Sequence, residues 1–388
     1  MTVHIKDFIQ AVKNVALAVP KFSAREKINP ILRCILIEDD RISSPANYGQ
    51  QITQKIDLGQ ILEPFAVDAK ELLTRLKLVP KNSIIWIKTA GNVVTVHWQG
   101  GSFSTPTLSA ADFPGQIPWP DNAQANTVKI TADAALFRDA LERLAPAMAY
   151  KDIRYYLNGL CLDLKQSGCK MISTNGHRLH CLDADFINRG YLGDGVFTPY
   201  SGPDLEVILQ DQHVHWLIKT LPKAGQVSMT FGYRSREGDY EKFITIEYGD
   251  MAIRCKSIDR EFPDYRRVIP TDLPYRFQVG RKPLIQVVRN VGSLCKEKFR
   301  PIIALNFSGT DQLVIQYPNL EGGGYQEQTA IESKELPADF VMGINPGYLL
   351  DAIQACASDK ITIQVRGQSD SILIEDENFK AVIMPCRL

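Results

Sequence analysis

Three segments of the chain share one pattern of apolar and polar positions. Residues 65–88, 207–231 and 340–365 each begin with a short apolar run, continue with apolar residues three and four positions apart, and end in a β-branched run. The spaced apolar positions are Leu72, Leu73 and Leu76, then Val214, Leu217, Ile218 and Leu221, then Leu349, Leu350 and Ile353. This spacing predicts an amphipathic helix followed by a strand in each segment.

A second helical period opens each third of the chain. Its apolar positions are Phe8, Val12, Val15 and Val19, then Leu136, Phe137, Leu141 and Leu144, then Leu284, Val287, Val288, Val291 and Leu294. Pairs of strand-like runs follow at 30–42, 156–174 and 302–317, with Asp, Gly or Ser at the turns. These turn residues are typical of hairpins, so we expect antiparallel strands after each helix.

The matched blocks indicate an internal repeat. We predict an α+β fold of three repeated domains at 1–126, 127–272 and 273–388, each with two helices packed on antiparallel sheet. The segments SAADFPG (109–115) and IDREFPD (258–264) close the first two domains. Domains of this class can look alike by chance, but three matched blocks in the same relative order favour a repeat.

The charge balance argues against a protein that grips nucleic acid over its whole surface. The 388 residues hold 44 Lys+Arg and 44 Asp+Glu, a formal net charge of zero, whereas such domains are usually strongly basic. The predicted helix faces do carry cations, namely Lys6, Lys13, Arg75, Lys77, Arg138, Arg143, Lys219, Lys223, Arg281, Lys282 and Arg289. Composition alone favours ordinary solvated helix faces for them.

No catalytic, metal or cofactor motif stands out, which predicts a non-enzymatic protein without a cofactor. The sequence has no phosphate-binding GxxxxGK[ST] loop, no HExxH and no GxSxG. His177 and His180 would point to opposite faces of a strand, and His213 and His215 to different faces of a helix. Eight scattered cysteines without CxxC, no signal peptide and no apolar stretch near ~18 residues predict a cytoplasmic chain without a membrane span.

Several local segments are more specific than composition explains. They are DIRYYLNGL (152–160), ISTNGHRLHCL (172–182), SIDREFPDYRRVIP (257–270), EKFRPI (297–302), NPGYLLDAI (345–353) and VIMPCRL (382–388). Together they resemble the β sliding clamp family, the β subunit of bacterial DNA polymerase III. The first third matches more weakly, through NPILRCILI (29–37) and LSAADFP (108–114).

The resemblance implies a DNA sliding clamp, a processivity factor without catalysis of its own. Members form head-to-tail homodimers, a ring of six domains with helices around the hole. The ring encircles double-stranded DNA without regard to sequence, and a pocket between domains 2 and 3 binds short peptide motifs of the DNA polymerase catalytic subunit, the clamp loader and repair proteins. The alternative is a clamp-derived peptide-binding protein that no longer forms a closed ring on DNA.

The resemblance also assigns residue roles. For the partner-peptide pocket it implies Arg154, Tyr156, Leu157, Thr174, Gly176, His177, Arg178, Leu179, Pro263, Arg267, Val268, Phe299, Asn345, Tyr348, Ser371, Val382, Ile383, Met384, Pro385, Arg387 and Leu388. For DNA contact it implies Arg25, Lys27, Lys151, Tyr155 and Tyr156, and for the dimer interface Phe103 and Leu294. Apolar side chains would hold a partner's hydrophobic anchors, while Arg and backbone groups would fix an extended peptide.

Some positions depart from the family pattern. Asn175 stands where the family usually has Asp, so we expect a hydrogen bond there but no charge. Cys386 replaces a longer Met, and residues 188–204 and 233–243 look like extended loops. Thr105 and Ser293, beside the expected dimer contact, are more polar than expected and motivate the alternative function.

Overall fold

The computed structural model describes residues 2–20, 29–46, 49–59, 63–115, 127–165, 167–188, 190–192, 196–198, 204–236, 239–295, 301–307, 311–317, 324–334 and 340–388. The chain divides into two compact units, one of residues 1–134 and 220–257 and one of residues 135–219 and 258–388. The predicted middle third thus contributes to both units. Its predicted boundaries near 126 and 272 stay a prediction.

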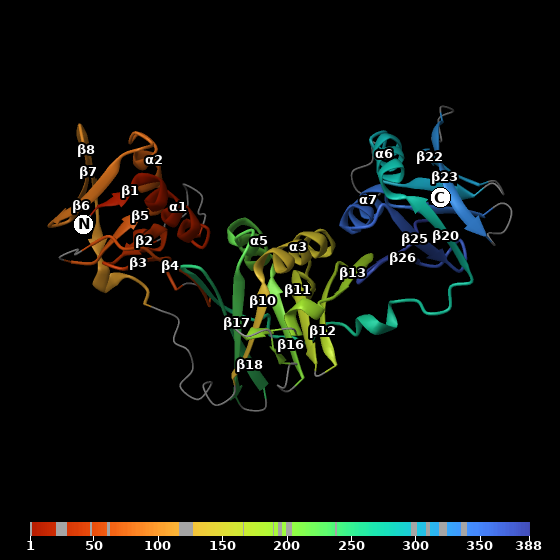
Figure 1. The fold of residues 1–388 in the computed structure, drawn as a ribbon, viewed down its shortest axis with the longest axis horizontal. Helices are drawn as coiled ribbons and strands as arrows, with labels where there is room; N and C mark the ends of the chain where they lie inside the picture. Colours follow the sequence, from red (N-terminus) through yellow and green to blue (C-terminus); the bar gives the residue numbers. More distant parts are fainter. Residues whose placement is uncertain are drawn as a thin grey trace. The chain divides into compact units, whose positions relative to one another are not determined.

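The first unit holds two antiparallel sheets. The smaller has the order β1 (Val3–His4), β6 (Ile84–Ala90), β7 (Val93–Trp98) and β8 (Gly101–Pro106). The larger has the order β10 (Thr127–Asp133), β17 (Gln226–Arg236), β18 (Asp239–Tyr248), β19 (Met251–Lys256), β4 (Gln50–Lys55), β3 (Arg41–Ser43), β2 (Cys34–Ile37), β5 (Phe65–Asp68) and β9 (Leu108–Ser109). Helices α1 (Ile5–Ala16) and α2 (Ala69–Leu76) lie side by side in this unit (Figure 1).

The second unit is organised around one continuous antiparallel sheet. Its order is β16 (Leu205–Gln210), β11 (Gly159–Lys165), β12 (Gly168–Thr174), β13 (Arg178–Asp183), β27 (Phe379–Ile383), β26 (Ile372–Asp376), β25 (Lys360–Val365), β20 (Tyr275–Gly280), β23 (Tyr325–Lys334), β22 (Gln312–Tyr317), β21 (Ile303–Phe307) and β24 (Phe340–Ile344). Strand β27 pairs with β13, so the last strand of the chain joins the strands of the middle third.

The helices of this unit are α3 (Ala134–Leu144), α4 (Asp185–Asn188), α5 (Asp211–Thr220), α6 (Arg281–Gly292) and α7 (Pro346–Ala355), and a separate hairpin joins β14 (Gly190–Leu192) to β15 (Val196–Thr198). Helices α6 and α7 pack side by side (Figure 1). The hairpin falls in the predicted loop at 188–204, which begins where α4 ends, and residues 189, 193–195 and 199–203 of this loop lie outside the described residues. In the predicted long loop at 233–243, β17 and β18 pair as far as Arg236 and Asp239.

The predicted α+β class is confirmed, and both helix patterns of each third form helices. The apolar periods are buried as expected in α1, where Phe8, Val12 and Val15 are 0 % exposed. Two predicted apolar positions differ: Leu136 is 51 % exposed and Leu294 is 38 % exposed. Leu294 lies beyond the end of α6, where the helical period no longer directs it inward. None of the described helices is long and apolar enough to span a membrane.

Candidate functional site

One face of the paired strands β13 and β27 forms the floor of a cavity of about 350 Å³. Leu179 and Val382 are directly opposite each other in the ladder, each is 1 % exposed, and both line the cavity. They belong to an apolar cluster that continues into Ile172, Phe262 and other side chains of the same unit. The floor therefore offers an apolar surface fixed by the sheet itself.

The opposite face of the same strands packs against helices. His180, adjacent to Leu179, is fully buried and its Nδ1 donates to the carbonyl oxygen of Arg143 in α3 at 2.9 Å. Ile383, adjacent to Val382, is 0 % exposed and does not line the cavity. Ile383 thus lies on the helix-facing side of β27, because neighbouring residues of a strand point to opposite faces, and its role as a pocket residue stays a prediction.

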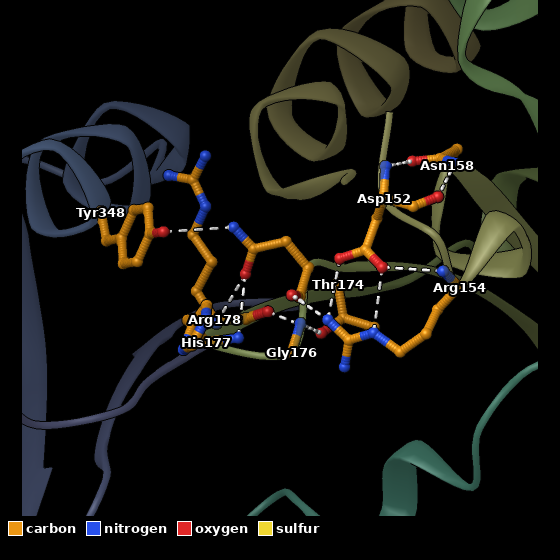
Figure 2. A network of polar contacts seen from close by, with 9 residues as sticks. Asp152, Arg154, Asn158, Thr174, Gly176, His177, Arg178 and Tyr348 are labelled. Atoms are coloured by element: carbon orange, nitrogen blue, oxygen red, sulfur yellow. Dashed lines mark hydrogen bonds and ion pairs between the residues drawn. The ribbon is translucent and has the colours of Figure 1, made fainter. Parts of the chain in front are cut away.

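The cavity rim on one side is a short hydrogen-bonded loop (Figure 2). Asp152 and Asn158 bond each other twice through backbone and amide groups, at 2.9 Å each. Arg154 lines the cavity and donates to both carboxylate oxygens of Asp152, at 3.1 and 2.9 Å. Hydrogen bonds from the Arg154 side chain and amide lower the pKa of Asp152 to about 2, so the pair stays charged at neutral pH.

The other side of the rim is the tight turn from Thr174 to Arg178. Asn175 Oδ1 accepts from the amides of His177 and Arg178 at 2.9 and 3.1 Å, which confirms the expected local hydrogen bond without an acidic charge. Gly176 has a φ of +86°, and a Cβ there would lie 2.9 Å from Nη1 of Arg154. The positive φ therefore favours glycine at this position, and a Cβ here would also displace the guanidinium of Arg154.

Tyr265 is a cavity wall that the sequence did not single out. It lies in a single 3₁₀ turn (Tyr265–Arg267), and its hydroxyl donates to Asp163 Oδ2 at 2.8 Å. Burial, with this hydrogen bond, raises the pKa of Tyr265, so the hydroxyl stays protonated and keeps donating. Its position inside the motif FPDYRRV, between two predicted pocket residues, was the available signal.

The structure brings most predicted pocket residues together. Those lining the cavity are Arg154, Tyr156, Leu157, Thr174, Gly176, His177, Arg178, Leu179, Pro263, Val268, Val382 and Met384. Pro385, Arg387 and Leu388 instead line a second cavity of about 570 Å³, together with the half-buried Cys386. Burial raises the pKa of the Cys386 thiol, which makes the thiolate unfavourable there.

Four predicted pocket residues lie elsewhere in the unit. The side chain of Arg267 is 86 % exposed and pairs with Asp264 at 3.1 Å, away from the cavity lining. Asn345 caps the N-terminus of α7 by accepting from two backbone amides, and Tyr348 in that helix accepts a bond from Asn175 at 3.5 Å. Ser371 is half-buried and lines neither cavity. Phe299 lies outside the described residues.

The predicted DNA-contacting residues of the middle third occupy the loop that also forms the cavity rim. Lys151 has a positive φ of 53°, and Tyr155 is 47 % exposed with its hydroxyl bonded by Arg260 Nε at 3.0 Å. Tyr150 and Ile153 are 75 % and 96 % exposed on the same loop. Tyr156 differs, because it lines the cavity. Arg25 and Lys27 lie outside the described residues.

The predicted dimer contacts are partly accessible. Phe103 is half-buried on β8, an edge strand of its sheet, and Leu294 is 38 % exposed. Ser293 is exposed, whereas Thr105 is 1 % exposed and its hydroxyl donates to Glu71 Oε1 at 3.1 Å. The side chain of Thr105 thus faces its own domain, so its polarity does not weaken a contact with another chain.

Two family models match the chain. Residues 131–264 match the central domain of the DNA polymerase III beta subunit, and residues 266–387 match its C-terminal domain. The chain belongs to the DNA polymerase III beta subunit family. This family, the beta sliding clamps, is the one that the sequence motifs resemble.

Curated relatives extend the similarity to nearly the whole chain. The beta sliding clamp of Vibrio cholerae is 25 % identical over 372 residues, and that of Salmonella typhimurium is 27 % identical over 367 residues. Each alignment covers 92 % of this chain and 93 % of the relative. The crystal structure of the Pseudomonas aeruginosa DNA polymerase III subunit beta has the same fold, with a TM-score of 0.83, 24 % identity and full coverage of both chains.

No group of three or more His, Cys, Asp or Glu among the described residues is placed to hold a metal ion. His213 is 1 % exposed while His215 is exposed, so the two diverge as the helical spacing predicts. The eight cysteines are free thiols.

Proposed function

We propose that this chain is a DNA sliding clamp, a processivity factor that encircles duplex DNA and tethers polymerases through the cavity on β13 and β27. The observation that carries this proposal is the cavity itself. Segments separated by up to about 230 positions, from Arg154 to Met384, converge on one apolar floor in a chain of the beta subunit family. An apolar trough edged by backbone groups suits an extended peptide with hydrophobic anchors.

The partners follow from this role. The cavity would take short motifs of the polymerase catalytic subunit, the clamp loader and repair proteins, and the chain would have no catalytic activity. Solved structures of clamps from Pseudomonas aeruginosa and Bartonella birtlesii are described as bound to griselimycin. This chain is 23 % and 21 % identical to those clamps, and we propose griselimycin as a probe for its cavity on β13 and β27.

The charge distribution favours a protein that holds DNA by encircling it over one that binds DNA tightly through many phosphate contacts. Several helix-face cations are already paired within their own helix: Arg75 with Glu71 at 2.8 Å, and Arg138 with Glu142 at 2.9 Å. Such pairing reduces the number of phosphates that the chain neutralises, and thus the affinity that would resist sliding. Lys151, Tyr155 and Tyr156, with Arg25 and Lys27, are the proposed DNA contacts.

Two measurements test the proposal. Analytical ultracentrifugation at micromolar concentration should give a homodimer, formed head to tail through Phe103 and Leu294. With a clamp loader and ATP, the protein should be retained on closed circular DNA and released when the circle is cut. A strictly monomeric protein that no loader retains on circular DNA would contradict the clamp.

The second candidate is a clamp-derived peptide-binding protein that forms no closed ring. Exposed Ser293 beside Leu294 favours it, whereas buried Thr105 does not. The same experiment separates the two, because a monomer that still binds griselimycin would support the second candidate.

A further inference from the structure

Helix α7 is held by two arginines that come from the middle third of the chain. Arg178 of β13 donates through Nη1 to Asp351 Oδ2 at 2.6 Å, and Arg143 of α3 donates through Nε to the carbonyl oxygen of Ala355 at 2.5 Å. Tyr348, Asp351 and Ala355 are spaced three and four residues apart, so they share one face of α7. This face of α7 is therefore hydrogen-bonded to β13 and α3 along two helical turns.

The guanidinium of Arg178 makes several contacts inside the protein besides its ion pair with Asp351. The side chain is 9 % exposed, its Nη2 donates to the carbonyl oxygen of Pro146, and its Cζ lies 4.4 Å from the ring centroid of Tyr348. Arg154, the other arginine of the cavity, has a side chain that is 46 % exposed. Figure 2 shows the Arg178 side chain directed toward Tyr348. An acidic group of a partner would find Arg154 accessible, whereas both terminal nitrogens of Arg178 already donate within the protein.

The same arginine anchors the cavity rim. Its amide donates to Asn175 Oδ1, its carbonyl oxygen accepts from Thr174 Oγ1 at 2.7 Å, and Asn175 Nδ2 donates to the hydroxyl of Tyr348 at 3.5 Å. The rim turn is thus tied to α7 twice, once through Arg178 and once through Asn175. Because the turn is already fixed in the free protein, it loses less conformational entropy when a peptide binds.

We propose that Arg178 and Asp351 act as positioning residues: their ion pair locks the rim of the peptide cavity to α7 and so sets peptide affinity without direct contact with the peptide's charged groups. This rests on the proposed peptide-binding role of the cavity. Because Asp351 is not among the residues that line the cavity, removing its charge separates positioning from direct binding.

A double-mutant cycle tests this assignment in the full-length protein. Griselimycin is titrated calorimetrically into the wild type, Asp351→Asn, Arg178→Met and the double variant. We expect each single variant to weaken binding about tenfold and the double variant to bind no more weakly than Arg178→Met, since both break one interaction. Glu142→Gln, which breaks the exposed pair with Arg138, is the matched control and should leave affinity unchanged.

Two outcomes of the cycle would overturn the assignment. If Asp351→Asn binds griselimycin as well as or better than the wild type, Arg178 acts by direct contact. If the losses multiply in the double variant, the two residues act independently.

Hydrogen exchange decides the same question without a ligand. In Asp351→Asn we expect the amides of His177 and Arg178 to exchange about tenfold faster, because the turn they close is no longer tied to α7. Unchanged exchange would overturn the lock. Failure of the wild type to bind griselimycin would instead count against the proposed function, while the exchange result would still decide the role of the ion pair.

Discussion

The substitution Gly176→Ala tests the cavity rim most sharply, because one methyl group opposes two features of the turn. Gly176 has a φ of +86°, in the left-handed region, where a residue with a Cβ is disfavoured by about 1–2 kcal/mol. The new Cβ would also lie 2.9 Å from Nη1 and 3.1 Å from Nη2 of Arg154. The guanidinium of Arg154 would have to shift from its present position on the rim.

The two effects have different consequences. The backbone cost should lower the free energy of unfolding by about 1–2 kcal/mol. Displacement of Arg154, which lines the cavity, should lower griselimycin affinity by roughly tenfold, the usual effect of losing one well-placed contact. The first quantity is measured by urea unfolding and the second by calorimetric titration.

Gly100→Ala is the matched control. Gly100 has a φ of +96°, but a Cβ there would meet nothing within 4 Å. It should lower stability by a similar amount and leave griselimycin affinity unchanged. In an Arg154→Ala background, Gly176→Ala should cost stability but no further affinity. The reasoning would be refuted if Gly176→Ala bound griselimycin as tightly as the wild type, or if both glycine variants lost the same amount of griselimycin affinity.

Three further predictions concern the second unit. Deleting residues 384–388 should abolish griselimycin binding, because Met384 is part of the cavity wall, and should leave the sedimentation coefficient of the dimer unchanged. Tyr265→Phe leaves the buried Asp163 without its hydroxyl donor, so urea unfolding should show a loss of about 1–2 kcal/mol. Burial lowers the pKa of His180 from 6.5 to about 4, and the unfolded chain therefore binds a proton first as the pH falls. The free energy of unfolding should fall by about 3 kcal/mol between pH 6.5 and pH 4 because of His180. His180→Gln should remove this part of the pH dependence of stability. A further part should remain, because burial also lowers the pKa of His213, to about 3.

The local elements of this protein could be predicted from its sequence. Apolar spacing located α1, α2, α3, α5, α6 and α7, because the apolar stripe that must be buried repeats with the period of the helix itself. The hairpin of β11 and β12 was predicted from another local signal, the Ser and Gly at its turn. The resemblance to the clamp family then predicted most of the residues that line the cavity.

Side-chain direction and long-range pairing were decided by the tertiary structure. Val382 lines the cavity while Ile383 is core, and this follows from the register of β27 against β13, a pairing of segments about 200 residues apart. Tyr265 became a wall because Asp163, far away in sequence, accepts its hydroxyl. Arg178 was expected to face a peptide, but Asp351 and Tyr348 of α7 attract its guanidinium inward. Local periods determine which elements form. The pairing of strands and of buried charges depends on non-local contacts, and these decide which way each residue of the site points.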